Sequence, residues 1–99
     1  MLTLFGINLI SVNKRNSCIK EITEYSANDS LGFNIKFNNG LQLSIVDDST
    51  PTSMEFELAI YDENSNISPI YFDHVIDVLR GCNVKRVEYY IDKLSSLLV

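Results

Sequence analysis

The chain has 99 residues, of which 45% are hydrophobic and 21% charged, and its formal net charge is −5. This length accommodates one domain, and the composition is that of a soluble globular protein rather than a disordered, collagenous or membrane-embedded chain. We therefore expect residues 1–99 to form a single domain with one modest hydrophobic core.

The N-terminal residues 1–12 are mostly apolar. A secretory signal would need a basic region before them and a small-residue cleavage site after them, and neither is present. A membrane-spanning helix takes about 20 residues, so we interpret this segment as a strand and expect a cytoplasmic protein without membrane contact. In that compartment Cys18 and Cys82 are expected to be reduced residues of the core.

A β-hairpin is predicted between residues 33 and 45, where apolar and polar residues alternate on both sides of a polar turn. A two-residue loop would set apolar residues opposite polar ones. A three-residue loop over residues 38–40 instead pairs Phe37 with Leu41 and keeps one face apolar. That loop needs a left-handed residue at its end, and Gly40 adopts this conformation without steric cost.

Further strands are predicted on both sides of this hairpin. Upstream, residues 2–12 and 18–25 are interpreted as two strands, and downstream residues 67–72 are interpreted as an edge or irregular strand, because they contain a proline. The segment 54–61 alternates strictly and is expected to bury one side, Met54, Phe56, Leu58 and Ile60, and to present the other, Glu55, Glu57, Ala59 and Tyr61.

The C-terminal residues change to a helical period. Apolar residues recur every three or four positions, which makes one stripe on a helix: Val84, Val87, Ile91, Leu94 and Leu98. Asn83 stands where its side chain can accept a hydrogen bond from the first turn. We expect a helix over residues 84–97 that lies across the apolar face of the sheet.

Residues 74–79 permit two interpretations. They form either a strand that ends at an Arg80-Gly81 turn, or a short helix whose turn into the next helix would resemble a DNA-binding helix-turn-helix. The strand interpretation completes an α+β fold. We therefore predict an antiparallel β-sheet of about five or six strands packed against one C-terminal α-helix.

Charge is unevenly distributed along the chain. Residues 1–46 carry +1 and residues 78–99 carry +2, whereas residues 47–77 carry −8 with no Lys or Arg. Such a block is either a solvated face or a local negative field that favours a basic protein partner and disfavours nucleic acid. The predicted partner-binding residues are seven of these eight acids with one tyrosine: Asp47, Asp48, Glu55, Glu57, Tyr61, Asp62, Glu63 and Asp73.

No pattern in the sequence predicts catalysis. There is no Gly-x-Ser-x-Gly elbow, Gly-rich phosphate loop or Cys-x-x-Cys pair. The carboxylates of Glu55 and Glu57, and those of Asp47 and Asp48, are interpreted as solvated rather than as a cation or acid–base site. The one histidine, His74, is interpreted as a surface or packed residue. We expect no catalytic residue, cofactor or metal.

Three short motifs carry a resemblance. They are Phe37-Asn38-Asn39-Gly40 in the hairpin, the strand Glu57-Leu58-Ala59-Ile60-Tyr61-Asp62, and Arg80-Gly81-Cys82-Asn83 before the closing helix. In this order, from about Leu31 to Leu98, the chain resembles small uncharacterised phage and prophage accessory proteins. The resemblance implies an origin in a mobile element and an extended conformation for residues 74–79, and it brings no catalytic residues.

The function predicted from these features is that of a small acidic, non-enzymatic interaction protein encoded by a phage or mobile element. It would dock on a basic surface of a host protein in the host cytoplasm, for example to inhibit a defence or replication protein, as a monomer or a homodimer. A first alternative is a homo-oligomer that sequesters a nucleotide-like small molecule. A second is a small enzyme that uses His74 as general base.

Overall fold

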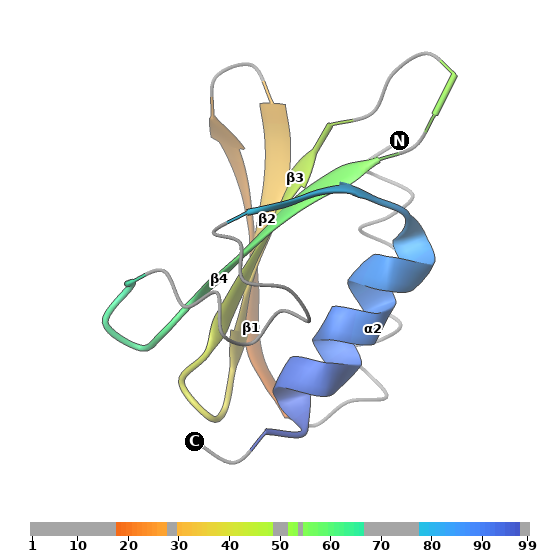
Figure 1. The fold of residues 1–99 in the computed structure, drawn as a ribbon. Coiled ribbons are helices and arrows are strands. Elements are labelled where there is room, and N and C mark those ends of the chain that lie inside the picture. Colours follow the sequence, from red (N-terminus) through yellow and green to blue (C-terminus); the bar gives the residue numbers. More distant parts are fainter. Residues whose placement is uncertain (1–17, 28–29, 49–51, 54, 67–77, 98–99) are drawn as a thin grey trace.

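A computed structural model of the chain describes residues 18–27, 30–48, 52–53, 55–66 and 78–97. These residues form a five-stranded antiparallel sheet with one helix against it (Figure 1). The predicted α+β fold is therefore confirmed. The strands predicted over residues 2–12 and 67–72, together with Met54, Asp73 and His74, lie outside the described residues.

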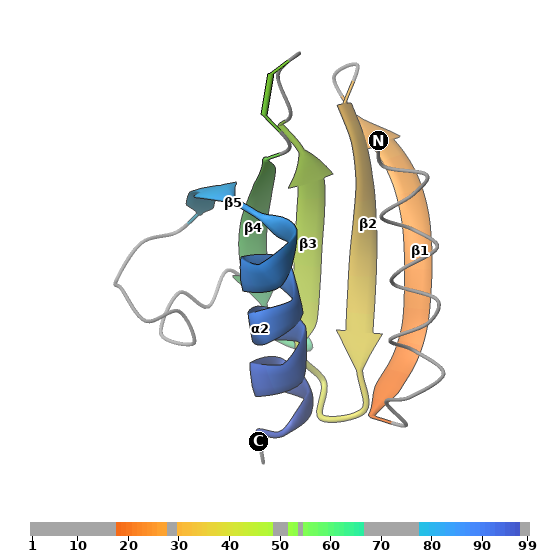
Figure 2. The ribbon, with the colours of Figure 1, turned by 90° about the vertical axis from the view of Figure 1, so that its right-hand side faces the viewer.

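The sheet is a meander in which strands adjacent in sequence pair with each other, in the order β1-β2-β3-β4-β5. Figure 2 shows the five strands with the helix lying in front of them. The elements are β1 (Ile19–Ala27), β2 (Ser30–Phe37), β3 (Gln42–Asp47), β4 (Phe56–Tyr61), β5 (Leu79–Cys82) and α2 (Val84–Ser95).

The β2–β3 hairpin has the register that its alternation predicts. Ile35 lies opposite Leu43, and the Phe37 N–H donates a hydrogen bond to the Leu41 carbonyl at 2.9 Å. Gly40 closes the three-residue loop with a φ of +92°, in the region that L-residues rarely enter. The three-residue loop and its glycine are thus confirmed.

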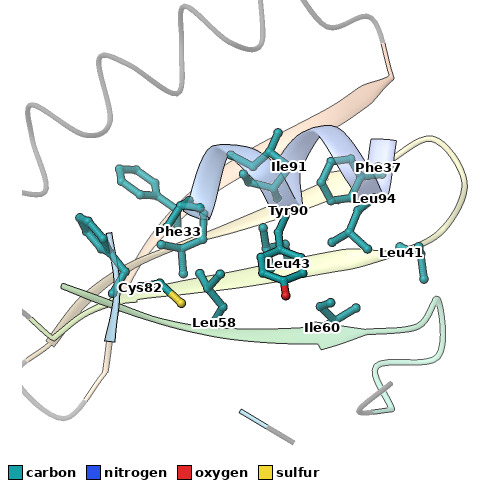
Figure 3. Packing of buried hydrophobic residues seen from close by; sticks show 14 of the residues in the cluster. Phe33, Phe37, Leu41, Leu43, Leu58, Ile60, Cys82, Tyr90, Ile91 and Leu94 are labelled. Atoms are coloured by element: carbon teal, nitrogen blue, oxygen red, sulfur yellow. The ribbon is translucent and has the colours of Figure 1, made fainter. Parts of the chain in front are cut away.

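One face of the sheet, which we call the inner face, holds the core (Figure 3). Its side chains come from alternate positions of β2, β3 and β4, as the pleat requires, and from positions on either side of a register shift in β1 and β5. The helix α2 contacts β4 and β5. Burying each large aliphatic side chain contributes about 1.5–3 kcal/mol, so this face supplies most of the stability of the fold. Residues with no exposed surface include Ile35, Leu43, Ile45, Phe56, Leu58, Ile60, Val87, Tyr90, Ile91 and Leu94.

The helix α2 begins as predicted and ends two residues earlier than predicted. The Asn83 side chain accepts a hydrogen bond from the Arg86 N–H at 2.9 Å, which confirms the N-cap. The last helical residue is Ser95. In the described part of the chain, no helix has the length and apolar character needed to cross a membrane.

The end of α2 is held by the turn of the hairpin, a contact that no sequence pattern indicated. The Asn39 side-chain amide donates hydrogen bonds to the carbonyls of Leu94 and Leu97 at 2.7 and 2.9 Å. Its oxygen accepts a bond from the Leu41 N–H at 3.1 Å. Because helix ends leave carbonyls without partners, Asn39 caps α2 while it also closes the β2–β3 turn.

The predicted turn at Arg80-Gly81 is wrong, because both residues belong to β5. β5 pairs with β4 across an irregularity: Leu58 lies opposite Leu79 and Phe56 opposite Cys82, so β5 has one more residue than β4 between these pairs. Gly81, with a φ of +67°, provides the backbone for this bulge. The helix-turn-helix alternative is excluded, because residues 79–82 form a strand.

The two cysteines differ. Cys82 lies in the core with 1% of its surface exposed, as expected, and burial raises the pKa of its thiol despite the opposing effect of Arg86. Cys18 is exposed, so its predicted core position is wrong. It precedes β1, the strand at one edge of the sheet, where few neighbours can cover it.

Candidate functional site

The opposite side of the sheet, which we call the outer face, is mostly polar and half-buried or exposed. Ala59 is the exception, because only 8% of its surface is exposed, so the expectation that this residue is presented is wrong. Alternation sends to it the side chains between those of the inner face. The strand register sets them in rows across the sheet. One row is Glu21, Lys36, Gln42 and Tyr61, the next is Thr23, Asn34, Ser44 and Ala59, and a third ends in Val46 and Glu57. The helix α2, the one helix that the structure describes, lies on the other face (Figure 2).

Three of the predicted binding residues gather at one end of the outer face. Phe56 is fully buried on the inner face, so Glu55 and Glu57 on either side of it project from the outer one. The Asp48 N–H donates a hydrogen bond to the Glu55 carbonyl at 3.0 Å, which places Asp48 next to them. We call Asp48, Glu55 and Glu57 the acidic end.

One cation from another part of the chain approaches the acidic end. The Arg80 Nε lies 3.7 Å from the Glu57 carboxylate, and the two side chains are 77% and 30% exposed. An ion pair this accessible to water contributes about 0–1 kcal/mol. It lowers the local negative charge without removing it.

The neighbouring Asp47 belongs to a different surface. It pairs with Phe56 across the β3–β4 ladder, and it shares the alternation of the buried residues Leu43 and Ile45. Asp47 therefore lies on the inner-face side at the end of its strand. Although Asp47 and Asp48 are consecutive in sequence, they do not lie on the same face.

Asp62 and Glu63 lie at the opposite end of β4 from the acidic end. A strand of this length spans about 17–20 Å, so the two groups of acids are separate. The Asp62 carboxylate accepts hydrogen bonds from the N–H groups of Asn64 and Asn66 at 2.9 and 3.0 Å, and this closes the turn after β4. Asp62 therefore has a structural role, whereas Glu63 is exposed.

The tyrosines also separate into different environments. Tyr61 is half-buried on the outer face, next to Gln42 in the same row. On α2, Tyr89 is 48% exposed and Tyr90 is fully buried. The cationic groups of Arg86 and Lys93 lie 5.8 and 5.7 Å from the centre of the Tyr90 ring. Tyr90 is thus part of the core, whereas Tyr61 and Tyr89 are accessible to solvent.

Two adjacent hollows mark the outer face away from the acidic end. The first, of about 380 Å³, is lined by Lys20, Lys36, Gln42, Glu63 and the hairpin turn. The second, of about 360 Å³, is lined by Asn34, Gln42, Ser44, Tyr61 and Ser65. Gln42 is common to both. No pattern in the sequence indicates this surface, because its residues come together only through the strand register.

Hydrogen bonds hold two of the side chains that line the second hollow, Asn34 and Gln42, in fixed orientations. The Asn34 amide donates to the Gln42 side-chain oxygen at 3.1 Å, and the Gln42 amide donates to the Asp62 carbonyl at 3.2 Å. Each amide nitrogen carries a second hydrogen that can bind a ligand. The two amides therefore form a fixed polar strip across β2 and β3.

The described residues offer little for metal chemistry. Across them, no three His, Cys, Asp or Glu side chains come close enough together to ligate a metal ion. No protein-family model, curated protein or solved structure matches the chain. The resemblance to phage accessory proteins therefore stays a prediction.

Proposed function

We propose that the protein is a small non-enzymatic interaction protein, which docks through the acidic end of its outer face on a basic surface of another protein. The observation that carries this proposal is the placement of Glu55 and Glu57 on one side of β4, with Asp48 beside them. The resemblance to phage proteins supports a partner from the host cell, such as a defence or replication protein.

The surface around the acidic end is consistent with such docking. Beyond it the outer face carries short polar and apolar side chains, Ser44, Val46 and Ala59, and then the half-buried Tyr61. Protein interfaces combine a little-charged centre that includes aromatic residues with a polar, charged rim. We assign the centre to these residues and the rim to the acidic end.

Electrostatics gives the proposal a measurable signature. Carboxylates at a rim mainly accelerate encounter with a basic surface, and they add less to the final affinity. Salt screens such charges over about 8 Å at physiological ionic strength. Association should therefore slow when salt is raised, whereas dissociation should change little.

The direct test compares two charge-reversed variants in an affinity capture from bacterial lysate. The first carries Glu55→Lys with Glu57→Lys on the outer face. The second carries Glu88→Lys with Asp92→Lys on α2, which changes the net charge equally at a different place. None of the four side chains is buried: Glu55, Glu57 and Glu88 are half-buried and Asp92 is exposed. Both variants should therefore keep the circular dichroism spectrum of the original chain.

The outer-face variant is expected to lose the proteins that the unmodified chain captures, and the α2 variant is expected to retain them. Retention of the same proteins by both variants would overturn the docking proposal. Loss from both would mean that net charge rather than position governs capture, and this too would overturn it.

A further inference from the structure

We infer that the outer face holds a second site, for a nucleoside phosphate, in the two hollows that share Gln42. The phosphate would lie at Lys20 and Lys36, and the base would lie against Tyr61. This site goes beyond protein docking, because it uses the end of the outer face away from the acidic end. It also differs in charge: two ammonium groups line it together with the Glu63 carboxylate, whereas the other end has a cluster of carboxylates.

The length of the site fits this class of ligand. Lys36 lies opposite Gln42, and Gln42 lies opposite Tyr61, so the three residues stand in one row on adjacent strands. Adjacent strands are about 4.8 Å apart, which places the backbones of Lys36 and Tyr61 about 10 Å apart. A nucleoside monophosphate extends over a similar length from its phosphate to its base.

The depth of the site comes from short side chains. The row next to Lys36, Gln42 and Tyr61 consists of Asn34, Ser44 and Ala59, which form a low floor beside the taller row. Asn34 and Ser44 line the second hollow, of about 360 Å³, whereas the first, of about 380 Å³, lies on the other side of Gln42, at the hairpin turn. Both volumes are within the range of about 300–1,000 Å³ for small-molecule sites. Together they have room for both halves of the ligand.

The phosphate end is defined by the lysines. Lysine ammonium groups bind phosphate as compact point charges with three donors. Lys36 lies 3.9 Å from the Glu21 carboxylate, with the two side chains 47% and 55% exposed. This pair is weak at such exposure, so a phosphate can compete for Lys36. The carboxylate of Glu63, which lines the same hollow, limits the affinity.

The base end is defined by an aromatic ring and two amides. Stacking of a base on an aromatic side chain contributes about 1–3 kcal/mol in proteins that bind single-stranded nucleic acids. The amides of Asn34 and Gln42 are held by the hydrogen bonds described above, so their remaining N–H groups are already oriented. Such preorganisation lowers the cost of binding the polar edge of a base. A ligand that carries both a phosphate and an uncharged aromatic base can bind the lysines and the Tyr61 ring together, whereas inorganic phosphate can bind the lysines alone.

The test is a titration of the full chain followed by two-dimensional amide NMR. The probes are AMP and UMP, with adenosine and inorganic phosphate as half-ligands. We expect the nucleotides to shift the amide signals of Lys36, Gln42, Ser44 and Tyr61, and AMP to bind about tenfold more tightly than adenosine, as one charge-assisted contact predicts.

Two sets of variants test which residues bind each end of the ligand. Lys20→Ala with Lys36→Ala should remove the tenfold advantage of AMP over adenosine, whereas Lys85→Ala on the exposed side of α2 should not. Tyr61→Ala should weaken AMP and adenosine alike by at least fivefold, as loss of stacking predicts. Tyr61→Phe, which keeps the ring and the fold, should retain binding, and so should Tyr89→Ala on α2.

The inference is overturned if neither AMP nor UMP shifts the named amides, or if inorganic phosphate produces the same shifts with the same affinity. It is also overturned if the lysine variant keeps the full advantage of AMP. The Glu55→Lys, Glu57→Lys variant serves to separate the two proposals. It should bind AMP normally while it loses protein capture, so either function can fail without the other.

Discussion

The two faces of one sheet differ in what they contribute to this protein. On β3, Leu43 and Ile45 have no exposed surface, whereas Ser44 and Val46, which follow them in alternation, are half-buried. The backbone and its hydrogen bonds are common to both sets, so the difference lies in the side chains and in what covers them. The inner face holds the core that stabilises the fold, and the outer face is the one to which we assign recognition.

This division teaches where function is to be sought in a small domain. A chain of 99 residues has one core, and here that core uses one side of each described strand. Polar residues at the alternate positions are therefore free of the packing constraint. Substitutions on the two faces can therefore test this division.

The largest effect is expected from neighbouring substitutions on β3. Ile45→Ala should lower the free energy of unfolding by about 2–5 kcal/mol, because it leaves a cavity in a fully buried site. Val46→Ala, one position along and on the outer face, should cost less than about 1 kcal/mol. Urea unfolding followed by circular dichroism measures both, and equal losses would contradict the division into two faces.

A second test concerns the clamp between the hairpin turn and α2. Asn39→Asp should lower the free energy of unfolding by about 2 kcal/mol, because a carboxylate cannot donate to the carbonyls of Leu94 and Leu97 and is repelled by the helix C-terminus. Asn38→Asp in the same turn is the control. A similar loss in both variants would mean that the turn itself, rather than the cap, is responsible.

The third test compares two glycines with positive φ. Gly40→Ala and Gly81→Ala should each cost about 1–2 kcal/mol in free energy of unfolding from backbone strain. A Cβ on Gly40 would also lie 3.2 Å from the Glu63 Cβ, whereas one on Gly81 would meet nothing within 4 Å. Thermal unfolding should therefore show the larger loss for Gly40→Ala. Glu63→Ala removes the Glu63 Oε2, which would lie 3.3 Å from the new Cβ, but keeps the Glu63 Cβ, so it should recover only the part of the loss that is due to Oε2.

The smallest effect concerns pH and the buried thiol. Burial raises the pKa of Cys82 in the folded state, so the folded protein retains a proton that the unfolded chain loses first. The stabilisation is complete below the pKa of the unfolded thiol, about 8.5, and is lost as pH rises through the folded pKa. Cys82→Ala should flatten the decline of melting temperature above pH 8.5. A decline as steep in Cys82→Ala as in the original chain would contradict this assignment.

The elements that could be predicted from the sequence are those set by local chemistry. The hairpin register followed from alternation and from Gly40, and the start of α2 followed from Asn83. The Arg80-Gly81 turn was wrong because the glycine that suggests a turn here supplies a bulge in β5. The pairing of Leu79 and Cys82 with β4, which decides between these structures, is a tertiary contact.

The acidic surface was predicted in part. The positions of Glu55 and Glu57 followed from strand period, but the six acids of this block that the structure describes do not form one patch. Asp47 lies on the inner-face side of β3, whereas Asp48 lies next to Glu55. The Asp62 carboxylate closes the turn after β4. The site around Gln42 lay beyond the sequence, because Lys36 and Tyr61 are 25 positions apart and meet only through two strand pairings.

Both proposed functions require an outer face that is open to solvent in the whole protein. Methyl NMR with a soluble paramagnetic reagent tests this directly on two adjacent residues of β3. The account predicts that the reagent broadens the methyl signals of Val46 and leaves those of Ile45 sharp, since only Ile45 is fully buried. Val46 methyls protected to the same degree as those of Ile45 would contradict it, because the face assigned to binding would then be covered.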